Sequence, residues 1–219
     1  MLSILGLVIF FGVWEAAVRL GWVSHRSLNA PSEVVETFIY KLTNANPDGS
    51  TLPQHFFQSL KLALTSFIIA TIIGVPLGWI MGYYKVADFL LNPLFEIIRP
   101  IPPIAWIPIV ILTMGIGMSA KVFIIFVAAF VPNVINSYLG IRLTDATLIN
   151  VAKTFGASDW KIFTTVCIPS SMNMVFTGIR LSLNASWTTL VAAEMLASIR
   201  GLGYMIQMGR TIIRPDIII

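Results

Sequence analysis

The chain has 219 residues, of which 57% are hydrophobic and only 11% are charged, and its formal net charge is +4. Soluble domains carry roughly 25% charged residues, so this chain has too little charge to cover the surface of a water-soluble globule. The composition suits a surface in contact with lipid. At about 20 apolar residues a span, the length has room for roughly five or six membrane spans. The cationic residues are scattered, so we expect no nucleic acid partner.

The first apolar stretch covers residues 2–20 and is expected to be a retained membrane span. A signal peptide would carry Lys or Arg before its apolar region, and none is present here. Trp14 and Glu15 also interrupt the place where a cleavage site would begin.

A polar stretch follows over residues 24–58. Ser32 and Glu33, directly after a proline, predict the start of a short helix. His25 and His55 lie in this stretch, and we expect them to be solvated rather than bound to a metal.

Four further apolar regions predict the remaining spans. In the first of them, Gly74, Gly78 and Gly82 would let a neighbouring helix approach closely. Near the end of the sequence, Pro215 and Asp216 precede three isoleucines and predict the first turn of a sixth span, so we expect the natural protein to continue. The four regions are residues 57–84, 94–117, 119–139 and 172–196.

The region 94–117 contains a proline-rich segment, residues 99–108, which cannot form a regular helix. Two interpretations remain open. The segment is either an interfacial loop that ends before a span begins at Ile109, or a broken helix that lines a pore.

Residues 142–165 mix charged and apolar side chains at helical spacing, which predicts an amphipathic helix on the water side of the bilayer. The distribution of Lys and Arg between the loops gives almost no bias in orientation. Cys167, the only cysteine, lies between Val166 and Ile168 and is expected to pack as a small apolar residue.

The segment 150–169 resembles the EAA loop of ABC importer permeases. The family pattern is Glu-Ala-Ala, three residues, Gly, nine residues, and Ile-x-Leu-Pro. This sequence departs from it with Asn150 for the glutamate and Val151 for the first alanine, which puts in doubt an ion pair made by that glutamate. The matching positions are Ala152, Gly156, Val166, Ile168 and Pro169.

Three flanking segments, in the same order, are similar to the nitrate/sulfonate/bicarbonate (taurine-type) branch of these permeases. They are residues 99–108, 191–195 and 201–204. The resemblance covers roughly residues 60–210. It implies an all-α polytopic transmembrane bundle of the type I importer fold, with five spans plus the start of a sixth. The whole chain, 1–219, would be one permease domain with a cytoplasmic coupling loop at 142–169.

The resemblance also implies the partners. They are a second permease copy, two ABC ATPase subunits, an extracytoplasmic solute-binding protein and the inner (plasma) membrane of a prokaryote, which the chain crosses several times. ATP and magnesium would be bound by the ATPase subunits, because this sequence has no Gly-x-x-x-x-Gly-Lys-[Ser/Thr] motif. We therefore expect a subunit with no catalytic residue, metal or cofactor, which transports a small anionic solute.

The coupling helix of the family sits in a groove on the ATPase, and small residues suit such docking. Ser158 or Asp159 would cap a second short helix, and Trp160 and Phe163 would be apolar anchors. The residues expected to contact the ATPase are Asn150, Ala152, Lys153, Gly156, Ala157, Ser158, Asp159, Trp160 and Pro169.

Arg180 is the costliest charge in a predicted span, and such an arginine faces a pathway, pairs with an acid or reaches for the headgroups. For Glu194 we favour a structural or gating ion pair, since a carboxylate would repel an anionic solute. The residues assigned to the translocation pathway are Arg99, Pro102, Pro103, Arg180, Asn184, Trp187, Thr188 and Glu194.

Two other classes of protein compete with this interpretation. An ion-coupled secondary transporter would work without an ATPase and often carries internal repeats, of which the sequence has no convincing example. A membrane-embedded enzyme would need clustered acids, bases or metal ligands, and Asp, Glu and His are scarce.

Overall fold

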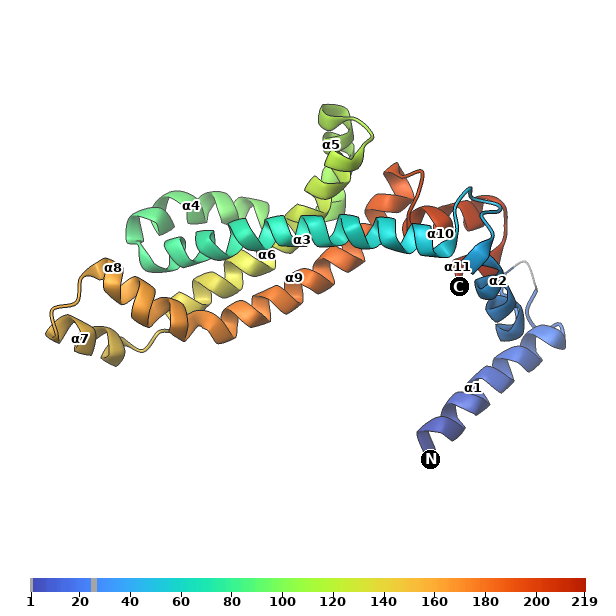
Figure 1. Cartoon of the computed structure of the whole chain (residues 1–219), viewed down its shortest axis with the longest axis horizontal. Coiled ribbons are helices and arrows are strands. Elements are labelled where there is room, and N and C mark those ends of the chain that lie inside the picture. The colour runs from blue at the N-terminus through green and yellow to red at the C-terminus, as the bar shows by residue number, and fades with distance from the viewer. Residues whose placement is uncertain (1, 25–26) are drawn as a thin grey trace. The chain divides into compact units, whose positions relative to one another are not determined.

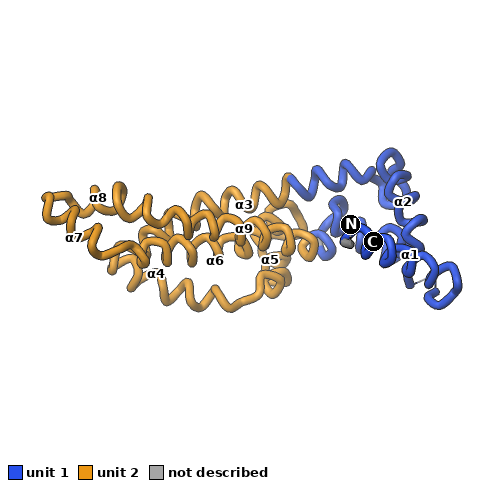
Figure 2. The backbone as a smooth tube through the Cα atoms, turned by 90° about the horizontal axis from the view of Figure 1, so that it is seen from below, with its two compact units in different colours: residues 1–60, 194–219 blue, residues 61–193 orange. Residues whose placement is uncertain are grey.

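The computed structural model of the chain describes residues 2–24 and 27–219, so the prediction for His25 falls outside it. The described residues form helices, turns and loops, with no β-strand among them (Figure 1). This confirms the all-α prediction. The chain divides into two compact units, which Figure 2 colours separately: residues 1–60 with 194–219, and residues 61–193.

The first unit confirms two predicted helices and adds one. The first predicted span is a single helix, and the helix predicted from Ser32 begins one residue earlier, where Glu33 accepts a hydrogen bond from the Ala30 amide at 3.2 Å. Helix α10 was not predicted, because Gly201 and Gly203 at its start hide the helical pattern. The helices are α1 (Leu2–Arg19), α2 (Pro31–Thr43), the start of α3 (Leu52–Tyr83), α10 (Leu202–Thr211) and α11 (Pro215–Ile218).

The second unit holds the rest of α3 and the long helices that pack on it. The amphipathic segment forms two short helices. The elements are α4 (Lys85–Ile98), α5 (Ile107–Met114), α6 (Met118–Arg142), α7 (Ala146–Thr154), α8 (Asp159–Ile162) and α9 (Ile168–Ala197). The predicted spans 57–84, 119–139 and 172–196 correspond to α3, α6 and α9, with bounds shifted by a few residues. The predicted span 94–117 is wrong as a single helix, because it is divided between the end of α4, a bend and the short helix α5.

Within the described residues, three helices are long and apolar enough to cross a membrane: α3, α6 and the continuous stretch Asp159–Leu196. A fourth span results if the bent pair Lys85–Ile98 and Pro103–Met114 is one span. A polytopic helical bundle is therefore confirmed. The count of five spans plus the start of a sixth remains a prediction, although α11 forms the expected turn with Pro215 at its start.

The proline-rich segment bends the chain by 86° between α4 and the helical residues after Pro103. The sequence-based bounds were wrong on both sides of this bend. Helix α4 already begins at Lys85, and α5 begins at Ile107 rather than Ile109. Pro103 and Pro108 stand in the first positions of helical turns, where a missing N–H costs nothing. The prolines therefore separate two helices, which form either a broken span or a re-entrant loop.

Glycines bring the backbones of α3 and α6 into direct contact, as the sequence predicted. A Cβ atom at Gly78 would lie 2.5 Å from the Val134 carbonyl oxygen and 2.7 Å from the Ser137 Cβ. A polar link joins the same helices to α9, since the buried Asn133 amide donates to Ser182 at 2.9 Å and to Thr71 at 3.1 Å. The second unit is thus built on closely packed small and polar residues.

Candidate coupling loop and translocation residues

Helix α7 begins at a side-chain cap. The Asp145 carboxylate accepts a hydrogen bond from the Thr147 amide at 2.8 Å, which satisfies one of the unpaired N–H groups of the first turn. The same hydrogen bond lowers the pKa of Asp145, because it favours the ionised form of the carboxyl group.

Gly156 ends α7 in the left-handed conformation, with φ of 74°. The Gly156 amide donates to the Lys153 carbonyl at 2.9 Å, and the Ala157 amide donates to the Ala152 carbonyl at 3.0 Å. This pair of bonds is the Schellman arrangement, in which glycine is favoured because it has no Cβ to clash. The spacing of Ala152, Gly156 and Ala157 is therefore the spacing that this turn requires.

The chain then enters a second helix that leads into the bundle. Ser158 caps α8 by accepting a hydrogen bond from the Lys161 amide at 3.4 Å. One π-helical turn, Phe163–Cys167, joins α8 to α9. Pro169 is the second residue of α9. In a regular helix its ring would clash with the carbonyl group four residues earlier, and the wider π turn leaves room for the ring.

A buried cluster anchors this segment to the second unit. Ile162, Phe163 and Cys167 are buried against Ile141, and the Tyr83 hydroxyl donates to the Asp159 carbonyl at 3.0 Å. Cys167 is packed as predicted. The prediction for Phe163 as an anchor for the ATPase was wrong, because its side chain is only 4% exposed and belongs to this cluster.

The outer side of the loop exposes apolar side chains. Phe155 is 85% exposed and Trp160 is 65% exposed, and Val151 stands out beside them. Large apolar side chains that protrude from a polar segment indicate a surface for a protein partner. Of the remaining residues assigned to coupling, Ala152 and Ala157 are half-buried, and Asn150, Lys153, Gly156, Ser158, Asp159 and Pro169 are exposed.

The cap at Asp145 predicts a pH dependence for α7. The folded-state pKa of Asp145 is depressed, so the stabilisation is present above its usual value and is lost as the pH falls through the lowered pKa. Below about pH 4, hydrogen exchange of residues 146–155 should therefore be faster in the wild type than in Asp145→Asn at the same pH. Asp145→Asn keeps an acceptor but does not titrate, and it should remove this dependence. An equal acid response in both proteins would contradict the prediction.

Four of the residues assigned to the pathway lie on one exposed stripe of α9. Arg180, Asn184 and Thr188 follow one another at intervals of four residues, and Trp187 is next to them. Arg180 is exposed and takes part in none of the ion pairs among the described residues. The Thr188 hydroxyl donates to the Asn184 carbonyl at 3.1 Å.

The other assigned residues are not brought together with this stripe by any hydrogen bond in the described part of the chain. Arg99 pairs with Glu96 at 3.1 Å and lines a cavity of about 220 Å³ between α3, α4 and α6. Pro102 is exposed and Pro103 is half-buried, both at the bend.

Glu194 differs from the other pathway residues because its side chain is fully buried. The Ser59 hydroxyl donates to its carboxylate at 2.8 Å, and the Gly203 amide donates to it at 3.0 Å. It therefore holds the start of α10 and presents no surface to a solute in this structure.

His55 was predicted to be solvated, and this prediction was wrong, since its ring is buried and Nδ1 accepts a hydrogen bond from the Gly201 amide at 2.9 Å. Sequence reasoning missed Ser59 altogether.

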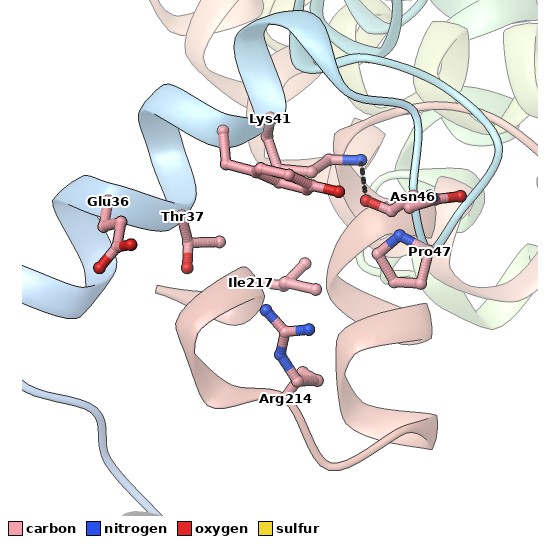
Figure 3. Close-up of a pocket in the computed structure, with 8 residues that line it drawn as sticks. Glu36, Thr37, Lys41, Asn46, Pro47, Arg214 and Ile217 are labelled. Atoms are coloured by element: carbon pink, nitrogen blue, oxygen red, sulfur yellow. Dashed lines mark hydrogen bonds between the residues drawn. The ribbon is translucent and has the colours of Figure 1, made fainter.

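The first unit also contains a cavity of about 300 Å³ (Figure 3). The Asp216 carboxylate beside it accepts hydrogen bonds from Arg214 and, at 2.8 Å, from Thr37, so α2 and α11 are tied together here. The cavity is lined by Glu36, Thr37, Tyr40, Lys41, Asn46, Pro47, Arg214 and Ile217.

Several apolar spans and close helix packing define a polytopic membrane protein. The family model described as "binding-protein-dependent transport system inner membrane component" matches residues 74–218, so the chain belongs to this family of ABC transporter permeases. The matched region includes the whole of the loop and α9.

Named relatives agree with this family. A Brucella melitensis protein named as a probable ABC transporter permease is 37% identical over 94% of this chain and 80% of its own length. The taurine transport system permease of Escherichia coli is 33% identical over all of this chain and 79% of its own length. The nitrate import permease of Synechocystis is 32% identical over 82% of this chain and 67% of its own length.

Proposed function

We propose that this chain is the membrane-spanning subunit of an ATP-driven importer. It forms the path for a small anionic solute and couples that path to cytoplasmic ATPase subunits through the loop 142–169. The observation that carries the proposal is the loop itself. Its inner side is anchored by Phe163 and Cys167, while Phe155 and Trp160 are largely exposed, at 85% and 65%.

This arrangement suits the transmission of force. A docked ATPase would contact Phe155 and Trp160. Helix α8 continues without a break through the π turn into α9. A displacement of the loop would therefore move α9 as a rigid lever. Because α9 also carries the stripe of Arg180, Asn184 and Thr188, closure of the ATPases would act directly on the pathway.

The proposed solute class rests on Arg180 and on the relatives. Arg180 is exposed and forms no ion pair with the described part of the chain. Its guanidinium would attract an oxyanion, and neighbouring amide and hydroxyl groups can add hydrogen bonds. Two relatives are named for taurine and nitrate, which carry a sulfonate and a nitrate oxyanion. We infer a small oxyanion of this kind, with selectivity shared with a solute-binding protein.

The assembly that we propose contains two permease copies, two ATPase subunits that bind ATP and magnesium, and one extracytoplasmic solute-binding protein. It resides in the inner membrane of a prokaryote. The chain itself supplies no catalytic residue or cofactor. The alternative is an ion-coupled secondary transporter, which would need no ATPase partner.

Substitution of Gly156 tests the proposal. A Cβ at this position meets nothing within 4 Å among the described residues, so Ala and Trp share the backbone strain of a left-handed residue, about 1–2 kcal/mol, and Trp adds a large side chain at the surface of the loop. Affinity purification from native membranes should recover an ABC ATPase with the wild type. We expect about threefold less ATPase with Gly156→Ala and at least about tenfold less with Gly156→Trp.

Two outcomes would contradict the proposal. If no ATPase co-purifies with the folded wild type under mild detergent, the secondary transporter becomes the better interpretation. If the ATPase co-purifies equally with wild type and both variants, the coupling role of the loop is wrong, although the chain can still belong to an importer.

A further inference from the structure

The first turn of α10 is held by side chains from two other helices. The Gly201 amide donates to His55 Nδ1 at 2.9 Å, the Leu202 amide donates to Ser59 Oγ at 2.8 Å, and the Gly203 amide donates to Glu194 Oε2 at 3.0 Å. These are N–H groups that a helix leaves unpaired at its start. We name the three accepting side chains, His55, Ser59 and Glu194, the α10 clamp.

The clamp determines the protonation of the His55 ring. Because Nδ1 accepts a hydrogen bond from an amide, it carries no proton, and the ring proton of the neutral form is on Nε2. Nε2 faces the Asp48 carboxylate at 3.1 Å. His55 is therefore a neutral side chain whose only basic nitrogen is occupied by the backbone of α10.

Charged and titratable groups surround His55 from every element that packs on it. Asp48 lies on the loop before α3 and is paired with Lys41 of α2, which is only 3% exposed. Lys41 also donates to the Asn46 carbonyl at 3.3 Å, as Figure 3 shows, and to the Ser50 carbonyl at 2.8 Å.

The remaining neighbours lie toward α9 and α10. The Glu194 carboxylate contacts Gly201, and the Tyr204 ring of α10 lies 6.3 Å from the His55 ring, centroid to centroid. Burial of the ring opposes its charged form, the Asp48 carboxylate attracts a proton to His55, and the Lys41 ammonium repels one. Lys41 and Asp48 compensate each other through their ion pair.

We propose that His55 is a proton-binding site that controls the attachment of α10. One proton from solvent forms an N–H bond at Nδ1, and the hydrogen bond from Gly201 to that nitrogen breaks. Two N–H groups then face each other, so Gly201 must move away from the ring. The resulting imidazolium keeps its Nε2–H toward Asp48, which stabilises the protonated state.

This mechanism predicts a local opening of α10 in acid. Gly201 is followed directly by the two residues held by Ser59 and Glu194, so its displacement strains both remaining bonds of the clamp. The first turn of α10 detaches, while α2 stays tied to the loop before α3 through Lys41 and Asp48. The inference rests on contacts within the first unit and holds whether or not the chain couples to an ATPase.

Hydrogen exchange of residues 199–206, measured by mass spectrometry on the full-length protein in lipid nanodiscs, tests the proposal. The matched variant is His55→Asn, whose amide oxygen can take the place of Nδ1 as an acceptor and does not titrate. Wild type and variant are compared at the same pH, so the intrinsic pH dependence of exchange cancels. A segment of α6, residues 124–134, reports whether the bundle stays folded.

At about pH 8 we expect the two proteins to exchange within about twofold of each other, and at about pH 5 we expect the wild type to exchange about tenfold faster. His55→Phe, which has no acceptor, should exchange fast at both pH values. Should His55→Asn fail to fold, Ser59→Ala serves instead. It weakens the clamp but keeps His55, so its exchange should still rise in acid.

The proposal is overturned if residues 199–206 of the wild type stay protected at about pH 5 while the α6 segment is intact. An equal acid response of wild type and His55→Asn would also overturn it, because the titrating group would then be another residue.

Discussion

Alanine in place of Gly78 is expected to lower the stability of the α3–α6 pair by about 1–3 kcal/mol. The new Cβ would lie 2.5 Å from the Val134 carbonyl oxygen, which belongs to the backbone of α6 and cannot rotate away. The helices would have to separate, and the contacts along their whole interface would weaken. For a chain of this size the loss corresponds to a decrease of about 2–12 °C in the thermal midpoint.

The matched control is Gly12→Ala in α1, where an added Cβ meets nothing within 4 Å. Alanine is the better helix former, so this change should leave the midpoint unchanged or raise it slightly. Gly74→Ala should lie in between, since its closest contact, at 3.0 Å, is the Asn133 side chain. Thermal unfolding in one detergent, followed by size-exclusion chromatography, ranks the three variants. Equal midpoints for Gly78→Ala and Gly12→Ala would show that the close approach of α3 and α6 is not required.

Replacement of Phe155 and Trp160 by alanine should weaken the complex with the ATPase without unfolding the permease. Their side chains are 85% and 65% exposed, so their removal leaves no cavity in this chain. Aromatic residues that are buried only in the complex commonly contribute 2 kcal/mol or more to binding, which corresponds to about a 30-fold loss of affinity for each. Transport driven by ATP should fall in parallel.

Two controls separate binding from folding. Phe89→Ala removes an equally exposed phenylalanine of α4, outside the loop, and should leave ATPase binding unchanged. Phe163→Ala removes the buried anchor of the loop and should lower thermal stability before it affects binding. Titration of purified ATPase against each variant in detergent gives the affinities. If the Phe155→Ala, Trp160→Ala double variant binds the ATPase as tightly as Phe89→Ala does, these two residues do not dock the ATPase.

Local features of the sequence were enough to predict the helical bundle and the shape of the loop. Apolar length determines which segments can cross lipid, and this property belongs to each segment alone. The glycine at position 156, four residues after Ala152, likewise predicts a helix end within six residues. The Schellman hydrogen bonds of Gly156 and Ala157 confirm this helix end. The glycines of α3 predicted close packing because only the absence of a Cβ permits it.

Tertiary structure alone decided which side chains face inward and where the irregular helices begin. Phe163 and Trp160 are both aromatic residues of the same amphipathic segment, so the sequence predicted the same role for them. In the structure Phe163 lies in a buried cluster, whereas Trp160, three residues earlier, is exposed. The start of α10 depends on Ser59 and His55, and Ser59 lies 135 positions before Glu194. No local pattern encodes such pairings, because the partners of a helix terminus are set by the packing of distant helices and not by its own residues.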